Sequence, residues 1–106
     1  MTKPKPRTYV FDIDGVVCSQ DKKGDYRKAK PLKRRILKIN QLYKEGNTII
    51  FYTSRGYLTK LNWSGLTDKQ FKRWKLKHHE IIFGKPYGDC YIDDRAVNDK
   101  QFFKLK

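Results

Sequence analysis

The sequence is poor in acidic residues, in cysteine and in long hydrophobic runs. Its 106 residues include 11 Asp and Glu against 25 Lys and Arg, which leaves a formal charge of +14 at pH 7. The apolar runs around Val16 and Ile50 are far shorter than the roughly 20 residues that a membrane helix requires, so no membrane span is expected. Residues 1–7 are basic and lack the apolar stretch of a secretory signal, which predicts a cytoplasmic protein.

The two cysteines, Cys18 and Cys90, lie far apart in dissimilar contexts. No disulfide framework and no Cys-x-x-Cys metal site is indicated, so both are interpreted as reduced packing residues. Six Phe, seven Tyr and two Trp supply enough apolar area for a folded chain. The length predicts one domain over residues 1–106.

The excess of basic charge has two readings. It favours anionic partners, such as a phosphorylated substrate or a nucleic acid bound through a basic surface. The lysines are scattered along the chain, which is equally typical of a merely solvated surface.

Apolar runs and turn residues predict an α/β domain with a mainly parallel sheet. A loop over residues 18–30 separates the first strand from a helix that Pro31 opens and Gly46 closes. A capping box at residues 67–70 predicts the start of a second helix, which runs to about Lys77. The expected strands cover residues 9–14, 48–53, 80–83 and 90–93.

Four of the few acidic residues follow the first and last expected strands. Asp12 and Asp14 end the first strand, and Asp93 and Asp94 end the last. The carboxyl ends of parallel strands are the edge where ligands bind. Converging carboxylates repel each other unless a cation lies among them, and hard oxygen ligands suit Mg²⁺.

Two more strand ends carry groups that suit a phosphoryl group. Thr53 ends the second strand with a hydroxyl and a backbone N–H, and Lys85 follows the third. A lysine offsets the negative charge of phosphate and carboxylates together. The combination predicts a phosphoryl-transfer site.

These segments together resemble the four motifs of the haloacid dehalogenase superfamily of phosphohydrolases. The resemblance covers nearly the whole chain, and a narrower one links it to small phosphatases of capsule or surface polysaccharide synthesis. It implies a Rossmann-like three-layer core with a mainly parallel sheet. The segments that carry the motifs are residues 10–16, 51–56, 84–86 and 91–95.

The resemblance also implies a mechanism. Asp12 is the expected nucleophile, which forms an aspartyl-phosphate, and Asp14 is the expected general acid and base. Thr53 and Lys85 are expected to stabilise charge on the phosphoryl oxygens. Mg²⁺ is the expected cofactor, and the residues expected to hold it are Asp12, Asp14, Asp93 and Asp94.

Substrate contact is assigned to Ser54, Arg55 and Arg95. For the two arginines, a solvated position or a pairing with a carboxylate is an equally open alternative.

Relatives in this superfamily usually carry a cap domain, which the intervals between these motifs leave no room for. The open site suits a polymeric substrate, or a small one enclosed by a neighbouring subunit of a homo-oligomer. The strands usually found beyond the fourth motif are expected to be reduced to residues 101–103.

Three functions stay open at this point. The first is a Mg²⁺-dependent phosphomonoesterase acting on a sugar phosphate or related metabolite. The second is a polynucleotide-end phosphatase, which the basic charge and the open site favour. The third is a non-catalytic module that binds nucleic acid or another anion.

Overall fold

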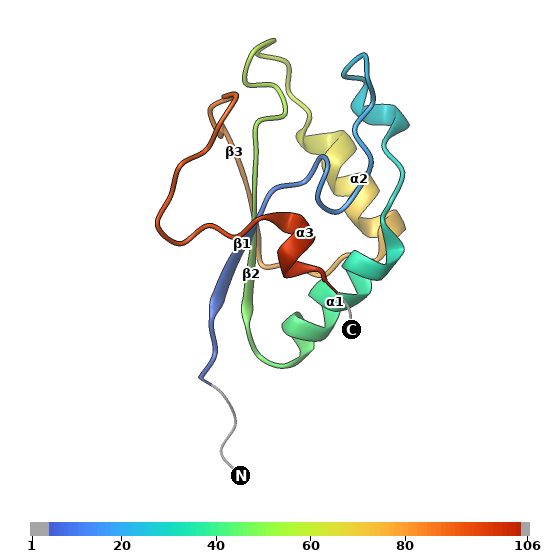
Figure 1. The fold of residues 1–106 in the computed structure, drawn as a ribbon. Coiled ribbons are helices and arrows are strands. Elements are labelled where there is room, and N and C mark those ends of the chain that lie inside the picture. Colours follow the sequence, from blue (N-terminus) through green and yellow to red (C-terminus); the bar gives the residue numbers. More distant parts are fainter. Residues whose placement is uncertain (1–4, 105–106) are drawn as a thin grey trace.

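Three parallel strands form the sheet, in the order β1-β2-β3 (Figure 1). The structure is a computed structural model that describes residues 5–104. The register aligns Phe11 with Phe51, and Phe51 with Ile81. Because all three strands run the same way, their carboxyl ends meet at one edge of the sheet. The strands are β1 (Thr8–Phe11), β2 (Thr48–Thr53) and β3 (Glu80–Phe83).

Helices α1 and α2 provide the two crossovers between the strands, and both lie on the same side of the sheet in Figure 1. Each connection moves one strand further in the same direction across the sheet. Two right-handed crossovers in the same direction place their helices on the same face. The helical segments are η1 (Tyr26–Lys28), α1 (Lys33–Lys44), α2 (Ser64–Trp74) and α3 (Asp99–Phe102).

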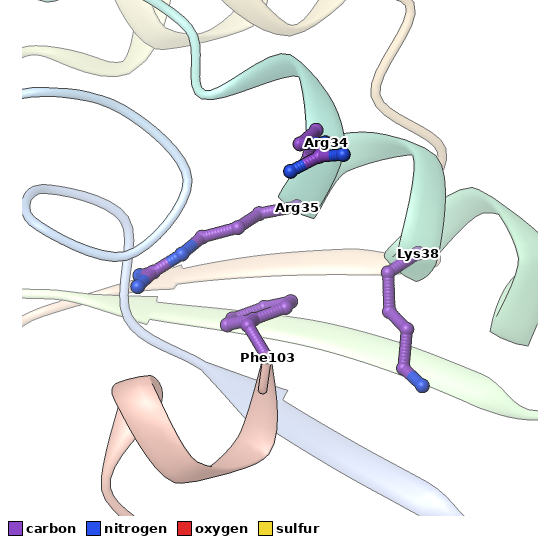
Figure 2. Close-up of a pocket in the computed structure, with 4 residues that line it drawn as sticks. All are labelled: Arg34, Arg35, Lys38 and Phe103. Carbon is purple, nitrogen blue, oxygen red and sulfur yellow. The ribbon is translucent and has the colours of Figure 1, made fainter. Parts of the chain in front are cut away.

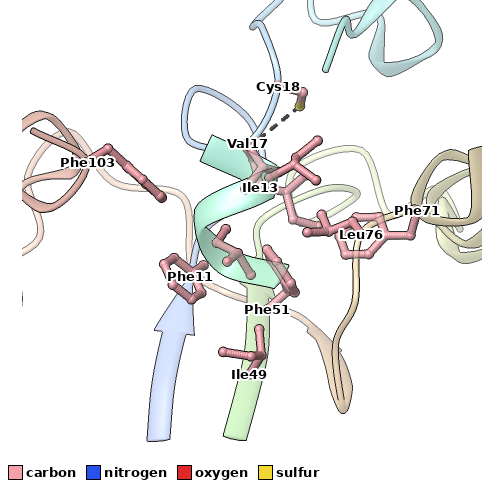
Figure 3. Close-up of a cluster of buried hydrophobic side chains, with 11 residues drawn as sticks. Phe11, Ile13, Val17, Cys18, Ile49, Phe51, Phe71, Leu76 and Phe103 are labelled. Atoms are coloured by element: carbon pink, nitrogen blue, oxygen red, sulfur yellow. Dashed lines mark hydrogen bonds between the residues drawn. The ribbon is translucent and has the colours of Figure 1, made fainter. Parts of the chain in front are cut away.

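The hydrophobic core lies between this face of the sheet and the helices (Figure 3). Alternate strand residues point into it, as the period of two along a strand requires. Phe51 packs edge-on against Phe71 of α2, with ring centroids 4.8 Å apart, and Phe11 packs against Phe103. The remaining buried members are Ile13, Val17, Cys18, Ile36, Ile39, Ile49 and Leu76.

The other face of the sheet carries no helix within residues 5–104. Val10 is 60% exposed and Ile82 is 40% exposed there. The expected third layer is therefore missing from the described part of the chain, because α3 also packs on the first face, with Phe102 against Tyr9 and Phe11.

The predicted strand over residues 90–93 does not form, and this prediction was wrong. The segment is irregular, and Ile92 is 94% exposed. Tyr91 is used in a local turn instead, since its hydroxyl donates to the Pro86 carbonyl at 2.7 Å and accepts from Gly88 N at 3.0 Å. This short apolar run has no neighbouring strand to pair with and no packed face, so an extended conformation would not stabilise it.

Residues 101–103 are helical or turn-forming rather than a remnant strand. Asn98 caps α3 by accepting a hydrogen bond from Lys100 N at 2.9 Å. Phe103 then follows the helix and is buried against Phe11.

Several element ends also differ from the prediction. The first strand ends at Phe11, so Asp12 already lies beyond it. Helix α2 begins at Ser64, one turn before Thr67 and with Trp63 as its N-cap. Just before it, Asn62 Oδ1 accepts from Ser64 N at 2.9 Å. It ends at Trp74, where Lys75 adopts a left-handed conformation.

The prediction of an α/β domain with a parallel sheet is confirmed, and the fold is that of a small Rossmann-like domain without a cap. Among residues 5–104, every helix falls short of the length and apolar character that a membrane crossing requires.

Helix α1 offers a direct test of this packing. Ile39 is fully buried in the core, whereas Leu37 on the same helix is 67% exposed. We expect Ile39→Ala to lower the free energy of unfolding by about 2–4 kcal/mol, because it removes buried methyl groups and leaves a cavity. The matched variant Leu37→Ala should change it by less than about 0.5 kcal/mol. Urea denaturation measures both, and equal losses would contradict the assigned face of α1.

Candidate active site

Asp12 and Asp14 are presented by a tight turn at the carboxyl end of β1. The amides of Val16 and Val17 both donate to the Ile13 carbonyl, at 3.1 and 2.9 Å. Gly15 has a φ of +82°, a conformation that glycine adopts without strain. Buried Ile13 anchors the turn in the core, which leaves the two flanking carboxylates at the sheet edge.

Asp12 lies beside Lys85, as the strand-end positions predict. The Nζ atom of Lys85 lies 3.3 Å from Asp12 Oδ2, and Asp12 Oδ1 accepts from the Ile13 amide at 2.7 Å. The Asp12 side chain is 33% exposed. Lys85 N donates to the Thr53 carbonyl at 3.0 Å, which fixes the lysine at the ends of β2 and β3. Its ammonium also lies 4.2 Å from the centre of the Tyr91 ring.

Thr53 is at this edge as predicted, but its side chain is buried. Its hydroxyl oxygen accepts from the amide of Arg55 at 3.1 Å and so closes the turn after β2. In this arrangement the Thr53 hydroxyl stabilises the turn after β2 and is not presented at the surface of the site.

Arg55 binds Asp14 in a bidentate ion pair. Its Nε and Nη2 atoms donate to the two carboxylate oxygens, each at 2.9 Å. Its Nη1 donates to Thr67 Oγ1 at 3.0 Å and to Gln70 Oε1 at 2.6 Å, and Nη2 lies 3.9 Å from Cys18 Sγ. These acceptors match all five N–H groups of a guanidinium. The Arg55 side chain is fully buried.

This geometry decides between the two roles that the sequence left open for Arg55. With every donor occupied and no exposed surface, Arg55 pairs with a carboxylate instead of reaching a substrate. It is a positioning residue, because it fixes both oxygens of Asp14 at the sheet edge.

Tyr26 of η1 covers the guanidinium from outside. The Arg55 Cζ atom lies 4.8 Å from the centre of the Tyr26 ring, and that ring packs edge-on against Trp63 at 5.1 Å. Gln70 holds the cover in place by donating to the Tyr26 carbonyl at 2.7 Å. Burial, and secondarily the charge of Asp14, raise the pKa of the Tyr26 hydroxyl.

Cys18 is a packing residue, as predicted. Burial above all, and then the nearby charge of Asp14, raise the pKa of its thiol to about 12. The protonated thiol lies 3.5 Å from Asp14 Oδ1 and donates toward it. Cys90 is exposed, so the prediction that it is a packing residue was wrong.

Within residues 5–104, no hydrogen bond or ion pair joins Asp12 to the remaining predicted site residues. Asp93, Asp94 and Arg95 lie in the exposed segment after β3. Asp93 Oδ1 accepts from the Arg95 amide at 2.8 Å, and this bond is the main cause that lowers the Asp93 pKa. Ser54 is half-buried, and its carbonyl accepts from the Tyr57 amide at 2.9 Å.

No three His, Cys, Asp or Glu residues within 5–104 are placed to hold a metal ion together. The carboxylates suit Mg²⁺ in kind, but the arrangement of the chain does not gather them.

Sequence reasoning missed the residues that surround Arg55. Thr67 and Gln70 are buried polar residues on the face of α2 that also carries Phe71. Their helical spacing with this aromatic residue is a signal that could have placed them inside. Nothing in the sequence identifies Tyr26 as the cover.

A hollow of about 440 Å³ lies beside Arg55, between the loops that follow β2 and β3. Lys60 lies at its side, with its ammonium 4.7 Å from the centre of the Tyr57 ring. Gly56 allows the loop to close, because a side chain there would collide with the Leu61 carbonyl. The remaining lining residues are Asn62, Trp63, Phe83 and Gly84.

The buried ion pair makes a double-mutant cycle informative. We expect Arg55→Met or Asp14→Ala alone to lower the free energy of unfolding by about 3–5 kcal/mol, because each leaves a buried charge unpaired. The double variant should lose less than the sum of the two. Arg27→Met, which breaks the exposed pair with Asp25 at 3.0 Å, should leave stability nearly unchanged. Additive losses in urea denaturation would contradict the coupling.

The two cysteines should differ sharply toward an alkylating reagent. Iodoacetamide at pH 8 is expected to label Cys90 in the folded protein and to spare Cys18, because the Cys18 thiol is buried and stays protonated. Both should be labelled in urea. Mass spectrometry of the peptides reads the result, and rapid labelling of native Cys18 would show that the turn after β1 opens readily.

No family model matches the chain, and no curated protein matches it at a significant level. A crystal structure of an MCSG target from Vibrio cholerae is similar, with a TM-score of 0.83 and 24% sequence identity, over 94% of this chain and 89% of that one. At this identity the similarity concerns the fold alone.

Proposed function

We propose that the protein is a phosphomonoesterase in which Asp12 is the nucleophile and Mg²⁺ the cofactor. The observation that carries the proposal is the pair formed by Asp12 and Lys85 at the carboxyl edge of the sheet, 3.3 Å apart. One partner is a carboxylate accessible enough to attack phosphorus. The other is a fixed cation that can balance the charge of a bound phosphoryl group.

The proposed reaction has two displacements at phosphorus. In the first, an Asp12 carboxylate oxygen forms a bond to phosphorus while the bond to the leaving alcohol breaks, and the leaving oxygen takes a proton. In the second, water attacks phosphorus, which releases inorganic phosphate and frees the carboxylate. We assign this proton to Asp14, which gives it to the leaving oxygen and recovers it from water. Arg55 binds both Asp14 oxygens in this structure, so one of these bonds has to open before Asp14 can carry the proton.

We include Mg²⁺ in the proposal because the available donors are carboxylate oxygens, which are the ligands that this ion prefers. Asp12, Asp14, Asp93 and Asp94 are the residues that would hold it, and the last two would have to approach from the irregular segment after β3. When bound, the ion would neutralise charge on the phosphoryl oxygens.

The hollow beside Arg55 is large enough for a metabolite-sized leaving group, although Asp12 and Lys85 are not among the residues that line it. Its volume of about 440 Å³ falls within the range typical of small-molecule sites, and aromatic side chains with one lysine line it. A sugar phosphate or related metabolite is therefore the proposed substrate. A polynucleotide end is the second candidate, because the net charge of +14 favours polyanions.

Phosphate release from an aryl phosphate tests the proposal. We expect turnover by the wild type with Mg²⁺, none with chelator, and a loss of about 1,000-fold or more in Asp12→Asn, because the nucleophile is removed. The matched variant Asp68→Asn, on the exposed surface of α2, should keep full activity. Circular dichroism confirms that both variants are folded.

Two outcomes would contradict the proposal. Undiminished turnover by Asp12→Asn would exclude an aspartyl-phosphate on this residue. A lack of phosphate release from aryl, sugar and 3′-phosphorylated oligonucleotide substrates would favour the non-catalytic binding module instead. If the enzyme is active, steep inhibition by salt would favour the polynucleotide end over a small substrate.

A further inference from the structure

A second hollow, of about 300 Å³, lies between α1 and Phe103, the residue that follows α3 (Figure 2). Three cationic side chains of α1, Arg34, Arg35 and Lys38, stand around the ring of Phe103. The phosphoryl-transfer proposal uses none of these four residues.

Arg35 is the fixed member of this cationic hollow. Its Nη1 donates to the Val16 carbonyl at 3.1 Å and to Asp99 Oδ2 at 2.8 Å. Its Cζ atom lies 4.8 Å from the centre of the Phe103 ring. Arg35 therefore ties α1 to α3 and to the turn after β1, which makes the wall of the hollow rigid.

Arg34 and Lys38 are the free members. Both are exposed, and no carboxylate within residues 5–104 lies at ion-pair distance from either. They are four residues apart, so their side chains leave the same face of α1. Asp99, the carboxylate that pairs with Arg35, is occupied by that ion pair. Among the residues that the structure describes, neither positive charge therefore has a carboxylate to compensate it.

The position of Arg34 in the first turn of the helix is a further unfavourable term for its charge. The first turn of α1 contains Lys33, Arg34 and Arg35 and no acidic residue, and the whole helix from Lys33 to Lys44 contains none. The helix dipole favours negative charge at this end, so each basic residue there is unfavourable. A bound anion would relieve both the dipole term and the mutual repulsion.

We propose that this cationic hollow binds the phosphodiester backbone of a nucleic acid. A backbone supplies regularly spaced negative charges, which suit two free cations on one helix face better than a single small anion does. The net charge of +14 attracts such a polyanion to the whole molecule, and the hollow gives it a fixed place. This proposal does not depend on the proposed catalytic activity, because it concerns binding by residues outside that site.

Fluorescence anisotropy with a short labelled oligonucleotide, single-stranded and as a duplex, tests the proposal. The variant Arg34→Gln/Lys38→Gln is compared with Lys69→Gln/Arg73→Gln, which removes the same two charges at the same spacing from exposed positions on α2. Affinity is measured from about 50 to about 200 mM salt. Circular dichroism confirms that both variants are folded.

We expect the α1 variant to bind about 10-fold or more weakly than wild type at low salt. Its slope of log affinity against log salt should fall by about 1.4 for a single strand or about 1.8 for a duplex, the value for two lost phosphate contacts. The α2 variant should stay close to wild type.

Three results would overturn the proposal. Equal losses in the two variants would mean that binding follows total charge rather than the hollow. Displacement of the oligonucleotide by inorganic phosphate, beyond the effect of chloride at equal ionic strength, would identify a small-anion site. Equally effective competition by polyglutamate would identify a general polyanion surface.

Discussion

The burial of one guanidinium organises this small domain. Arg55 follows β2, yet its partners come from the turn after β1, from η1 and from α2. Removing an arginine from water is costly, and the cost is offset only when each N–H finds an acceptor. Asp14 supplies the charge that makes this burial feasible. The sheet edge, the crossover helix and the covering segment are therefore fixed relative to one another by a single side chain.

That arrangement separates the two aspartates that follow β1. Asp14 has both oxygens bound by a buried cation, whereas Asp12 is more exposed and faces the ammonium of Lys85. Two chemically identical groups two residues apart thus occupy different environments.

The sequence predicted the three strands of the sheet, because each is a short apolar run with one face packed toward the helices. It failed at residues 90–93, since a run such as Tyr91-Ile92 forms a strand only where a neighbour receives it, and Ile92 lies in solvent. At the site, strand-end positions were enough to pair Asp12 with Lys85. The partners of Arg55 are side chains from segments that are distant in the sequence, so no local sequence pattern predicts them.

The bonds around Arg55 also set the order in which the domain can be completed. Asp14 and Gln70 are joined through the same guanidinium, so neither reaches its final environment until α2 has docked. During synthesis, the turn after β1 therefore reaches its final packing only after most of the chain, including α2, has been made. A truncated chain that stops before α2 would carry Arg55 and Asp14 without Thr67 or Gln70. The carboxyl edge of its sheet would be incompletely folded and exposed to quality-control proteases.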